Sequence, residues 1–162
     1  MPGLKIQITK LHPDAIIPAY ATPGSVGMDL YALSDYTVNS GERVMARTGV
    51  AIALPDGFEA TIRPRSGNAW KHGVTVMNSP GTVDSDYRGE LKVCLVKLSN
   101  VQIKHGPGAT FTQHSDGHTF AIRKGDRIAQ LVITPVLRAS LQEVEKLDET
   151  VRGEGGFGST GA

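Results

Sequence analysis

The stretch LKVCL, residues 91–95, carries the pattern that decides the fold class. Leu91, Val93 and Leu95 alternate with Lys92 and Cys94, and this period of two is typical of a strand with one buried face. The segment LKIQIT, residues 4–9, has the same alternation near the start of the chain, so we expect a strand with one buried face there too. The two segments predict β-structure.

Further strand-like runs are spread along the remaining chain, at residues 26–33, 43–54, 58–62, 74–77, 118–122 and 128–134. Glycine- and proline-rich turn clusters separate them, at residues 39–41, 55–57, 79–81, 88–89 and 124–126. Many short strands with such turns predict a sandwich, a jelly roll or a barrel. One short helix is expected over residues 67–72, with Ser66 as its N-cap and Gly73 as its end.

The composition limits both the size of the protein and its partners. A chain of 162 residues fits one domain, and a net charge of +1 provides no basic footprint for nucleic acid. The single cysteine, Cys94, rules out an internal disulfide and suits a reducing compartment. No apolar run is long enough to span a membrane, and residues 1–4 lack the pattern of a secretory signal. We therefore expect a cytoplasmic protein that contacts neither membrane nor nucleic acid.

The tail RGEGGFGSTGA, residues 152–162, is rich in groups that bind phosphate. It matches the spacing GxGxxG, and it matches a P-loop frame except that Ser159 replaces lysine, but no helix can follow either pattern. Its glycines can still turn N–H groups toward an anion, while Arg152, Ser159 and Thr160 add donors. The alternative interpretation is a disordered, glycine-rich end of the chain.

Three other segments carry candidate chemistry. Arg65, Ser66 and Gly67 lie at the expected helix start and would make a compact phosphate clamp, unless they are merely solvated. Within residues 78–90, Asp84 and Asp86 would face one side of a strand, where one carboxylate could act as a general base. The alternative there is a polar hairpin connection with an Asx-turn.

Two further acidic residues have structural interpretations. Asp29 lies in an otherwise apolar strand and needs a partner, and we favour an arginine over the water shell of a cation. Asp126, in the turn that opens the strand at residues 128–134, is expected to accept from the turn backbone.

The sequence lacks the motifs of several other classes of enzyme and metal site. It contains no HExxH, no paired CxxC and no GxSxG, which removes the motifs of zinc hydrolases, zinc ribbons and serine hydrolases. His105, His114 and His118 match no established set of metal ligands. We interpret them as residues of an exposed loop.

Taken together and in order, five segments resemble the motifs of the trimeric dUTP diphosphatase (dUTPase) family. The segments contain PGSVGMDL within residues 21–30, PRSGNAWKHG at 64–73, GTVDSDYRGE within 78–90, GDRIAQLV at 125–132 and RGEGGFGSTG at 152–161. The resemblance implies an all-β subunit, a distorted jelly roll or β-barrel with one short helix, that assembles as a homotrimer with active sites at subunit interfaces. It also implies a jelly-roll domain over residues 1–150, and a mobile tail over 151–162 that closes the site of a neighbouring subunit.

The activity implied by this resemblance is hydrolysis of dUTP to dUMP and pyrophosphate, which limits uracil incorporation into DNA and supplies dUMP for thymidylate synthesis. The implied cofactor is Mg²⁺, held mainly by the triphosphate and water with no direct protein ligand, and Asp29 would be either structural or linked to Mg²⁺ through water. Asp84 would be the base, and Tyr87 would pack under the deoxyribose and exclude a 2′-hydroxyl. The resemblance implies structural roles for Asp86 and Asp126.

The remaining implied roles are substrate contacts. The uracil edge would be read by Asn78 and by the backbone around Gly81, Thr82, Val83 and Lys92. The phosphates would be held from the core by Arg65, Ser66, Gly67 and Gln130. The tail would add Arg152, Gly158, Ser159 and Thr160 around the terminal phosphates, with Phe157 stacked on the base.

One feature departs from the family pattern, because the connection at residues 101–119 is longer than a short hairpin. We interpret it as a plain surface loop, with docking of a protein partner as the alternative. Two other functions also remain open at this point. One is a dCTP deaminase of the same fold, and the other is a regulatory module that senses dUTP without turning it over.

Overall fold

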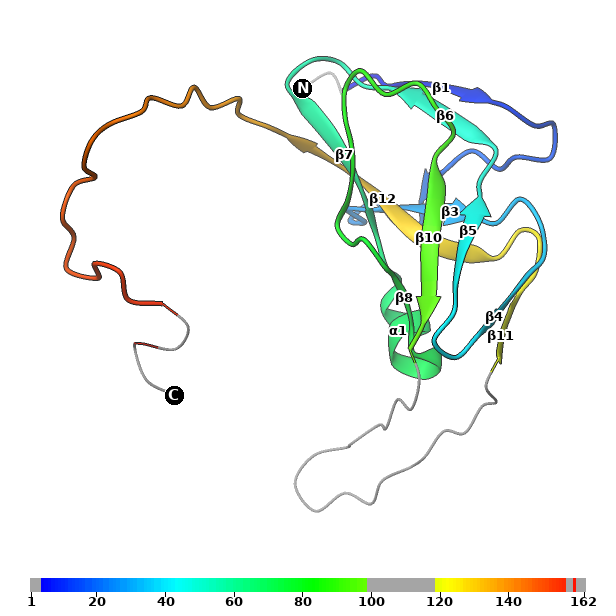
Figure 1. The fold of residues 1–162 in the computed structure, drawn as a ribbon. Coiled ribbons are helices and arrows are strands. Elements are labelled where there is room, and N and C mark those ends of the chain that lie inside the picture. Colours follow the sequence, from blue (N-terminus) through cyan, green and yellow to red (C-terminus); the bar gives the residue numbers. More distant parts are fainter. Residues whose placement is uncertain (1–3, 99–118, 157–158, 160–162) are drawn as a thin grey trace.

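The computed structural model describes residues 4–98, 119–156 and 159 (Figure 1). Over these residues the regular secondary structure consists of β-strands and one short helix, which confirms the predicted fold class. The elements in chain order are β1 (Gln7–Lys10), β2 (Ala19–Tyr20), β3 (Met28–Tyr31), β4 (Tyr36–Asn39), β5 (Arg43–Arg47), β6 (Val50–Ala53), β7 (Phe58–Arg63), α1 (Ser66–His72), β8 (Val74–Val76), β9 (Gly81–Val83), β10 (Lys92–Lys97), β11 (Thr119–Ile122) and β12 (Arg127–Pro135). The long loop predicted at residues 101–119 lies outside the described residues, apart from Thr119.

The described strands form four sheets and no closed barrel. The largest has five strands in the order β2-β3-β12-β7-β9, and a second has the order β5-β10-β8. Two pairs, β1-β6 and β11-β4, complete the set, and every ladder is antiparallel. β9 is an edge strand of the five-stranded sheet. In the second sheet, the start of β10 has a partner strand on one side only. These two free edges border the candidate site.

The core joins the inward faces of the two larger sheets. Leu91, Val93 and Leu95 are each at most 1% exposed and pack with Leu30 and Leu131 from the five-stranded sheet. The alternation that predicted a strand with one buried face is thus confirmed for β10. Burial of side chains of this size contributes about 1.5–3 kcal/mol each to folding, so β10 is firmly anchored.

The first strand differs from its prediction. β1 forms and pairs with β6, but all four of its residues are exposed, and Ile8 retains 38% of its surface. The expectation of a buried face at residues 4–9 is therefore wrong, except that Ile6 packs partly against the core. Alternation identifies which side chains share a face, whereas what covers that face depends on the rest of the fold.

The helix begins one residue earlier than expected. Arg65 is the N-cap, with an extended backbone and no side-chain cap hydrogen bond, so the prediction of Ser66 as N-cap is wrong. Gly73 ends α1 as predicted, at φ 61°, and its N–H donates to the carbonyl of Ala69 at 3.1 Å. The buried ammonium of Lys97 donates to the carbonyl of His72 at 2.9 Å, which ties the C-terminus of α1 to β10.

The run at residues 43–54 forms two strands because the backbone turns between β5 and β6. Gly49 makes this turn at φ 72°, and a Cβ there would lie 2.9 Å from the Cβ of Ala15. Only glycine fits both the backbone conformation and the space. The turn therefore fixes the position of Arg47 and Thr48, at the end of β5 beside the start of β10.

The chain leaves the body of the protein after β12. The N–H of Val136 donates to the carbonyl of Gly57 at 2.9 Å, and the following segment runs outward as an extended arm (Figure 1, orange to red). Leu137 and Leu141 on this arm are almost fully exposed. Among the described residues, no helix is long and apolar enough to cross a membrane.

Candidate active site

A pocket of about 280 Å³ lies where β9 approaches the start of β10. It brings together seven of the predicted site residues, Asn78, Gly81, Thr82, Val83, Asp84, Tyr87 and Lys92. Four further lining residues were not predicted, namely Met45, Ile62, Glu90 and Leu91. Glu90 ends the predicted motif and Leu91 follows it directly, so both could have been found there, whereas β5 and β7 bring Met45 and Ile62 from distant parts of the sequence.

The walls of this pocket are edges of two sheets. β9 pairs only with β7, through Thr82 opposite Thr61, and β8 covers the second edge of β10 only from Leu95 onward. Alternate backbone N–H and C=O groups of an edge strand point away from its partner. The pocket therefore offers backbone donors and acceptors to a flat polar group that enters between the strands.

Gly81 gives the pocket room for the amide of Asn78. A Cβ on Gly81 would lie 3.1 Å from Nδ2 of Asn78, which is tighter than most contacts of a Cβ atom. A side chain at this position would push the amide from its place. Gly81 therefore determines where the one side-chain amide of the pocket points.

Asp84 occupies a different local structure from the one expected. β9 ends at Val83, and the N–H of Tyr87 donates to the carbonyl of Asp84 at 3.2 Å, which closes a turn. The prediction that Asp84 and Asp86 share one side of a strand is wrong. Asp84 lines the pocket, while Asp86 is exposed and does not.

The ring of Tyr87 is held by a hydrogen bond of its hydroxyl and lies close to Gly89. The hydroxyl donates to the carbonyl of Glu90 at 3.1 Å, and a Cβ on Gly89 would collide with the ring and with the hydroxyl. Tyr87 is nevertheless 44% exposed, so much of its side chain remains accessible to a ligand. An exposed aromatic ring fixed at its far end provides a rigid surface for stacking.

A second cluster of predicted residues surrounds Asp29 in β3. Asp29 is 4% exposed, and its oxygens lie 3.3 Å from Nε of Arg65 and 3.3 Å from Nη1 of Arg127. The expectation that an arginine is its partner is confirmed. The contact of Oδ1 with Arg65 is an ion pair without hydrogen-bond geometry, because Oδ1 accepts no hydrogen bond among the described residues.

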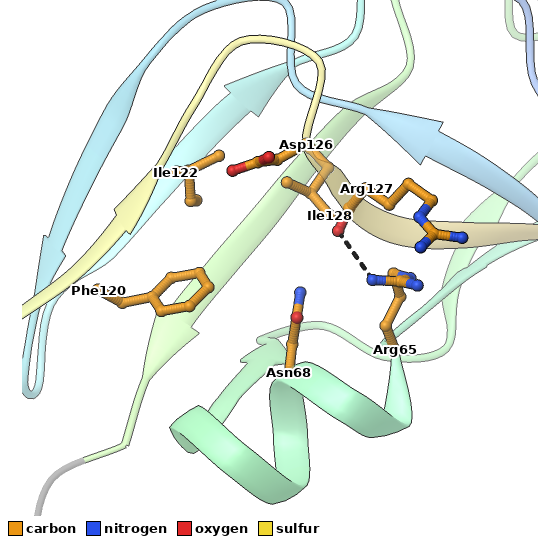
Figure 2. Close-up of a pocket in the computed structure, with 7 residues that line it drawn as sticks. All are labelled: Arg65, Asn68, Phe120, Ile122, Asp126, Arg127 and Ile128. Carbon is orange, nitrogen blue, oxygen red and sulfur yellow. Dashed lines mark hydrogen bonds between the residues drawn. The ribbon is translucent and has the colours of Figure 1, made fainter. Parts of the chain in front are cut away.

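Next to this ion pair lies a second pocket of about 220 Å³, lined by Arg65, Asn68, Phe120, Ile122, Asp126, Arg127 and Ile128 (Figure 2). Arg65 Nη1 donates to the carbonyl of Arg127 at 3.3 Å, which joins the start of α1 to the start of β12. Asp126 accepts from the N–H of Arg123 at 2.8 Å, so its predicted role in the turn is confirmed.

Ser66, Gly67 and Gln130 lie near the same ion pair. Ser66 and Gly67 are exposed in the first turn of α1, directly after Arg65. Gln130 is half-buried in β12, where it pairs with Asp29 on one side and with Arg63 on the other. The structure thus gathers Asp29, Arg65, Ser66, Gly67 and Gln130 into what we call the arginine cluster.

Asp84 lies toward the Phe58 end of β7, whereas the arginine cluster lies beside Arg63 at its other end. Val83 pairs with Ala60, and Gln130 pairs with Arg63, so three residues of β7 separate the two levels, roughly 10 Å at the usual rise of a strand. Asp84 and Arg65 lie beyond these levels in opposite directions. In Figure 1 the loop that leads into β10 lies at the far end of the molecule from α1.

The tail folds into consecutive turns at the end of the arm. The N–H of Gly153 donates to the carbonyl of Thr150 at 3.0 Å, and Nε of Arg152 donates to the carbonyl of Gly155 at 2.8 Å. Arg152 and Ser159 line neither pocket. The predicted contacts Phe157, Gly158 and Thr160 lie outside the described residues.

Sequence comparison places this chain among known enzymes. The dUTPase family model matches residues 13–114 and 111–161. The chain is 48% identical to the deoxyuridine 5′-triphosphate nucleotidohydrolase of Nautilia profundicola, over 98% of this chain and 99% of the relative. It is 49% identical to the enzyme of the same name from Wolinella succinogenes, over 98% and 95% of the two chains.

Structural comparison agrees with this result. A mutant dUTPase of Staphylococcus bacteriophage 80alpha, solved with dUpNHpp, matches with a TM-score of 0.81 and 25% identity, over 98% of this chain and 99% of that chain. A mutant dUTPase from phage phi11 of S. aureus, described with a structural Mg(II) ion, matches with a TM-score of 0.73 and 25% identity, over 88% and 98%. With a matching family model over most of its length and relatives near half identity, the chain belongs to the dUTPase family.

Proposed function

We propose that the protein hydrolyses dUTP to dUMP and pyrophosphate by attack of water on the α-phosphorus. The observation that carries this proposal is the pocket between β9 and β10, which unites Asp84 with Asn78 and Tyr87 in a chain of the dUTPase family. The similar proteins are named deoxyuridine 5′-triphosphate nucleotidohydrolases, which supports the same reaction here.

Recognition of uracil rests on the strand edges and on one side-chain amide. The free backbone groups of Thr82 and Val83, the backbone of Lys92 and the amide of Asn78 surround the pocket and match the donors and acceptors along a uracil edge. The pocket of about 280 Å³ is small for a whole nucleotide, so the base enters and the phosphates stay outside. A snug fit around the base excludes the methyl group of thymine.

The chemical step uses Asp84 as a general base. Its carboxylate takes a proton from a water molecule while the water oxygen forms a bond to the α-phosphorus. The bond from this phosphorus to the oxygen that bridges to the β-phosphate breaks, and pyrophosphate leaves with that oxygen. Tyr87, fixed by its hydrogen bond to Glu90, lies against the deoxyribose and sets the distance between the phosphorus and Asp84.

A complete site requires more than one copy of the chain. The phosphate clamp of Arg65, Ser66, Gly67 and Gln130 lies in the opposite direction along β7 from Asp84, separated by at least roughly 10 Å of strand, which favours a clamp supplied by another copy. A neighbouring copy therefore supplies the clamp. We propose a homotrimer, in which cyclic symmetry repeats this shared site at each interface.

The C-terminal tail adds the last part of the proposed shared site. The chain is divided into a β domain at residues 1–150 and a tail at 151–162 that closes over the site of a neighbour. The outward course of the arm supports this proposal, because the arm extends away from the body of its own chain (Figure 1). Arg152, Ser159 and Thr160 would hold the terminal phosphates, Gly158 would allow close approach, and Phe157 would stack on the base.

Magnesium fits this site as a partner of the triphosphate. Over the described ranges, no group of three or more His, Cys, Asp or Glu residues could hold a metal ion. Two arginines engage the carboxylate of Asp29, so it fits contact through water better than direct ligation. When bound, Mg²⁺ would neutralise charge on the triphosphate and on the departing pyrophosphate.

An assay of pyrophosphate release with Mg²⁺ and dUTP, dTTP, dCTP or UTP tests the proposed function. We expect release from dUTP and little from the other three nucleotides, because the pocket selects both base and sugar. Release of ammonia from dCTP without pyrophosphate would instead show a deaminase. Tight binding of dUTP without pyrophosphate would show a sensor, and the names of the similar proteins favour neither alternative.

A further inference from the structure

The carboxylate of Glu90 is almost buried and is held by several hydrogen bonds. Its side chain is 9% exposed, and both oxygens lie within hydrogen-bond distance of Nε of Arg47, at 3.0 and 3.1 Å. Oε1 also accepts from the N–H of Gly49 at 2.8 Å. Charge-assisted bonds of this kind are among the stronger polar contacts in proteins, so they fix Glu90 to the turn between β5 and β6.

The same turn holds the residue that follows Glu90. The N–H of Leu91 donates to the carbonyl of Val50 at 2.9 Å, and the buried hydroxyl of Thr48 donates to the carbonyl of Leu91 at 2.5 Å. The loop at residues 84–91 therefore has one end attached to β9 and the other end attached to residues 47–50. The loop carries the proposed base and the proposed sugar platform, so these attachments control the geometry of both.

The backbone of Glu90 transmits this attachment to the pocket. Its carbonyl accepts the hydrogen bond from the Tyr87 hydroxyl at 3.1 Å, and this bond orients the exposed ring. The position of the carbonyl depends in turn on where the carboxylate is held. Arg47, Glu90 and Tyr87 thus form a continuous chain of contacts from β5 to the pocket.

We infer that Glu90 is a positioning residue for substrate selection, and that it acts by fixing Tyr87 against the deoxyribose. The inference rests on the proposed hydrolysis of dUTP. In this role the carboxylate touches neither the phosphates nor water at the α-phosphorus. Its loss affects the binding of substrate and the rejection of a 2′-hydroxyl much more than it affects proton transfer at Asp84.

The test is the variant Glu90→Gln, which preserves side-chain length but removes the carboxylate charge and one of the two oxygens that accept from Arg47. We expect KM for dUTP to rise about tenfold and the preference for dUTP over UTP to fall about tenfold, with kcat within about twofold of wild type. The matched control is Glu42→Gln. Glu42 also binds a turn, through the N–H and Nδ2 of Asn39 at 3.1 and 2.8 Å, and it does not line the pocket.

A second variant separates positioning from general loss of structure. Tyr87→Phe removes the hydroxyl that Glu90 holds, so the losses in sugar preference from Glu90→Gln and Tyr87→Phe should not add in the double variant. Additive losses would overturn the inference, as would a fall in kcat with unchanged KM or an unchanged preference for dUTP over UTP. If the wild type itself releases no pyrophosphate from dUTP, the proposed function fails instead, and the two failures are thus distinguishable.

Discussion

Mixing two inactive variants is expected to restore activity if neighbouring copies share each site. Asp84→Asn removes the base, and Arg65→Gln weakens the clamp by removing the guanidinium charge. Each variant alone should lower kcat by on the order of 100-fold. The proposed division of the site between copies rests on the roughly 10 Å of β7 that separates its two parts.

The expected recovery follows from counting intact sites. In a trimer assembled at random from equal amounts, a given site takes Asp84 from an Arg65→Gln copy half of the time. It takes Arg65 from an Asp84→Asn copy half of the time, so about one quarter of all sites are intact. Co-refolding the two variants and measuring pyrophosphate release should therefore give about one quarter of wild-type activity. Activity that stays at the level of the parents, on the order of one hundredth, would refute the shared site.

Three further predictions concern the tail, the pocket and a surface ion pair. Truncation before Arg152 should leave the oligomer folded but greatly reduce activity, and an active truncated protein in the pyrophosphate assay would exclude a closing tail. Gly81→Ala should displace the amide of Asn78 and raise KM for dUTP about tenfold, measured by steady-state kinetics, whereas an unchanged KM would remove Asn78 from base recognition. The hydrogen bond from Lys124 to Asp14, at 2.7 Å, and then the charge of Lys124 lower the pKa of Asp14 below its ordinary value of 3.8. The contribution of the Asp14–Lys124 pair to the stability of the fold is therefore present above pH 3.8 and is lost as the pH falls through the lowered pKa. Replacing the lysine, in Lys124→Met, should return the NMR-detected titration of Asp14 toward 3.8.

Local patterns in the sequence predict the strands well because side-chain alternation is a local property. The segment around Leu91, Val93 and Leu95 forms β10 with the predicted buried face. The same pattern in β1 predicts the strand but not its surroundings, since Ile8 is exposed. Burial depends on which distant elements cover a face, and two residues that alternate identically can therefore differ in exposure.

The sequence motifs predicted those parts of the candidate site whose residues lie close together along the chain. Seven predicted residues line one pocket, and Asp29 has its arginine partners. The local geometry of Asp84 was not predictable, because β9 stops at Val83 and the chain then turns. The role of Glu90 was also hidden, since its partners Arg47 and Gly49 are 43 and 41 residues away along the chain. Only the fold brings these groups together.

The most direct test of the proposed mechanism compares the turnover of dUTP by two variants, Asp84→Asn and Asp86→Asn. Both substitutions replace a carboxylate by an amide in the same turn, but only Asp84 lines the pocket. We predict that Asp84→Asn binds dUTP nearly as well as wild type while its kcat falls on the order of 100-fold or more, and that Asp86→Asn retains most of its activity. Undiminished turnover by Asp84→Asn, with dUTP bound as in wild type, would contradict the assignment of Asp84 as the base.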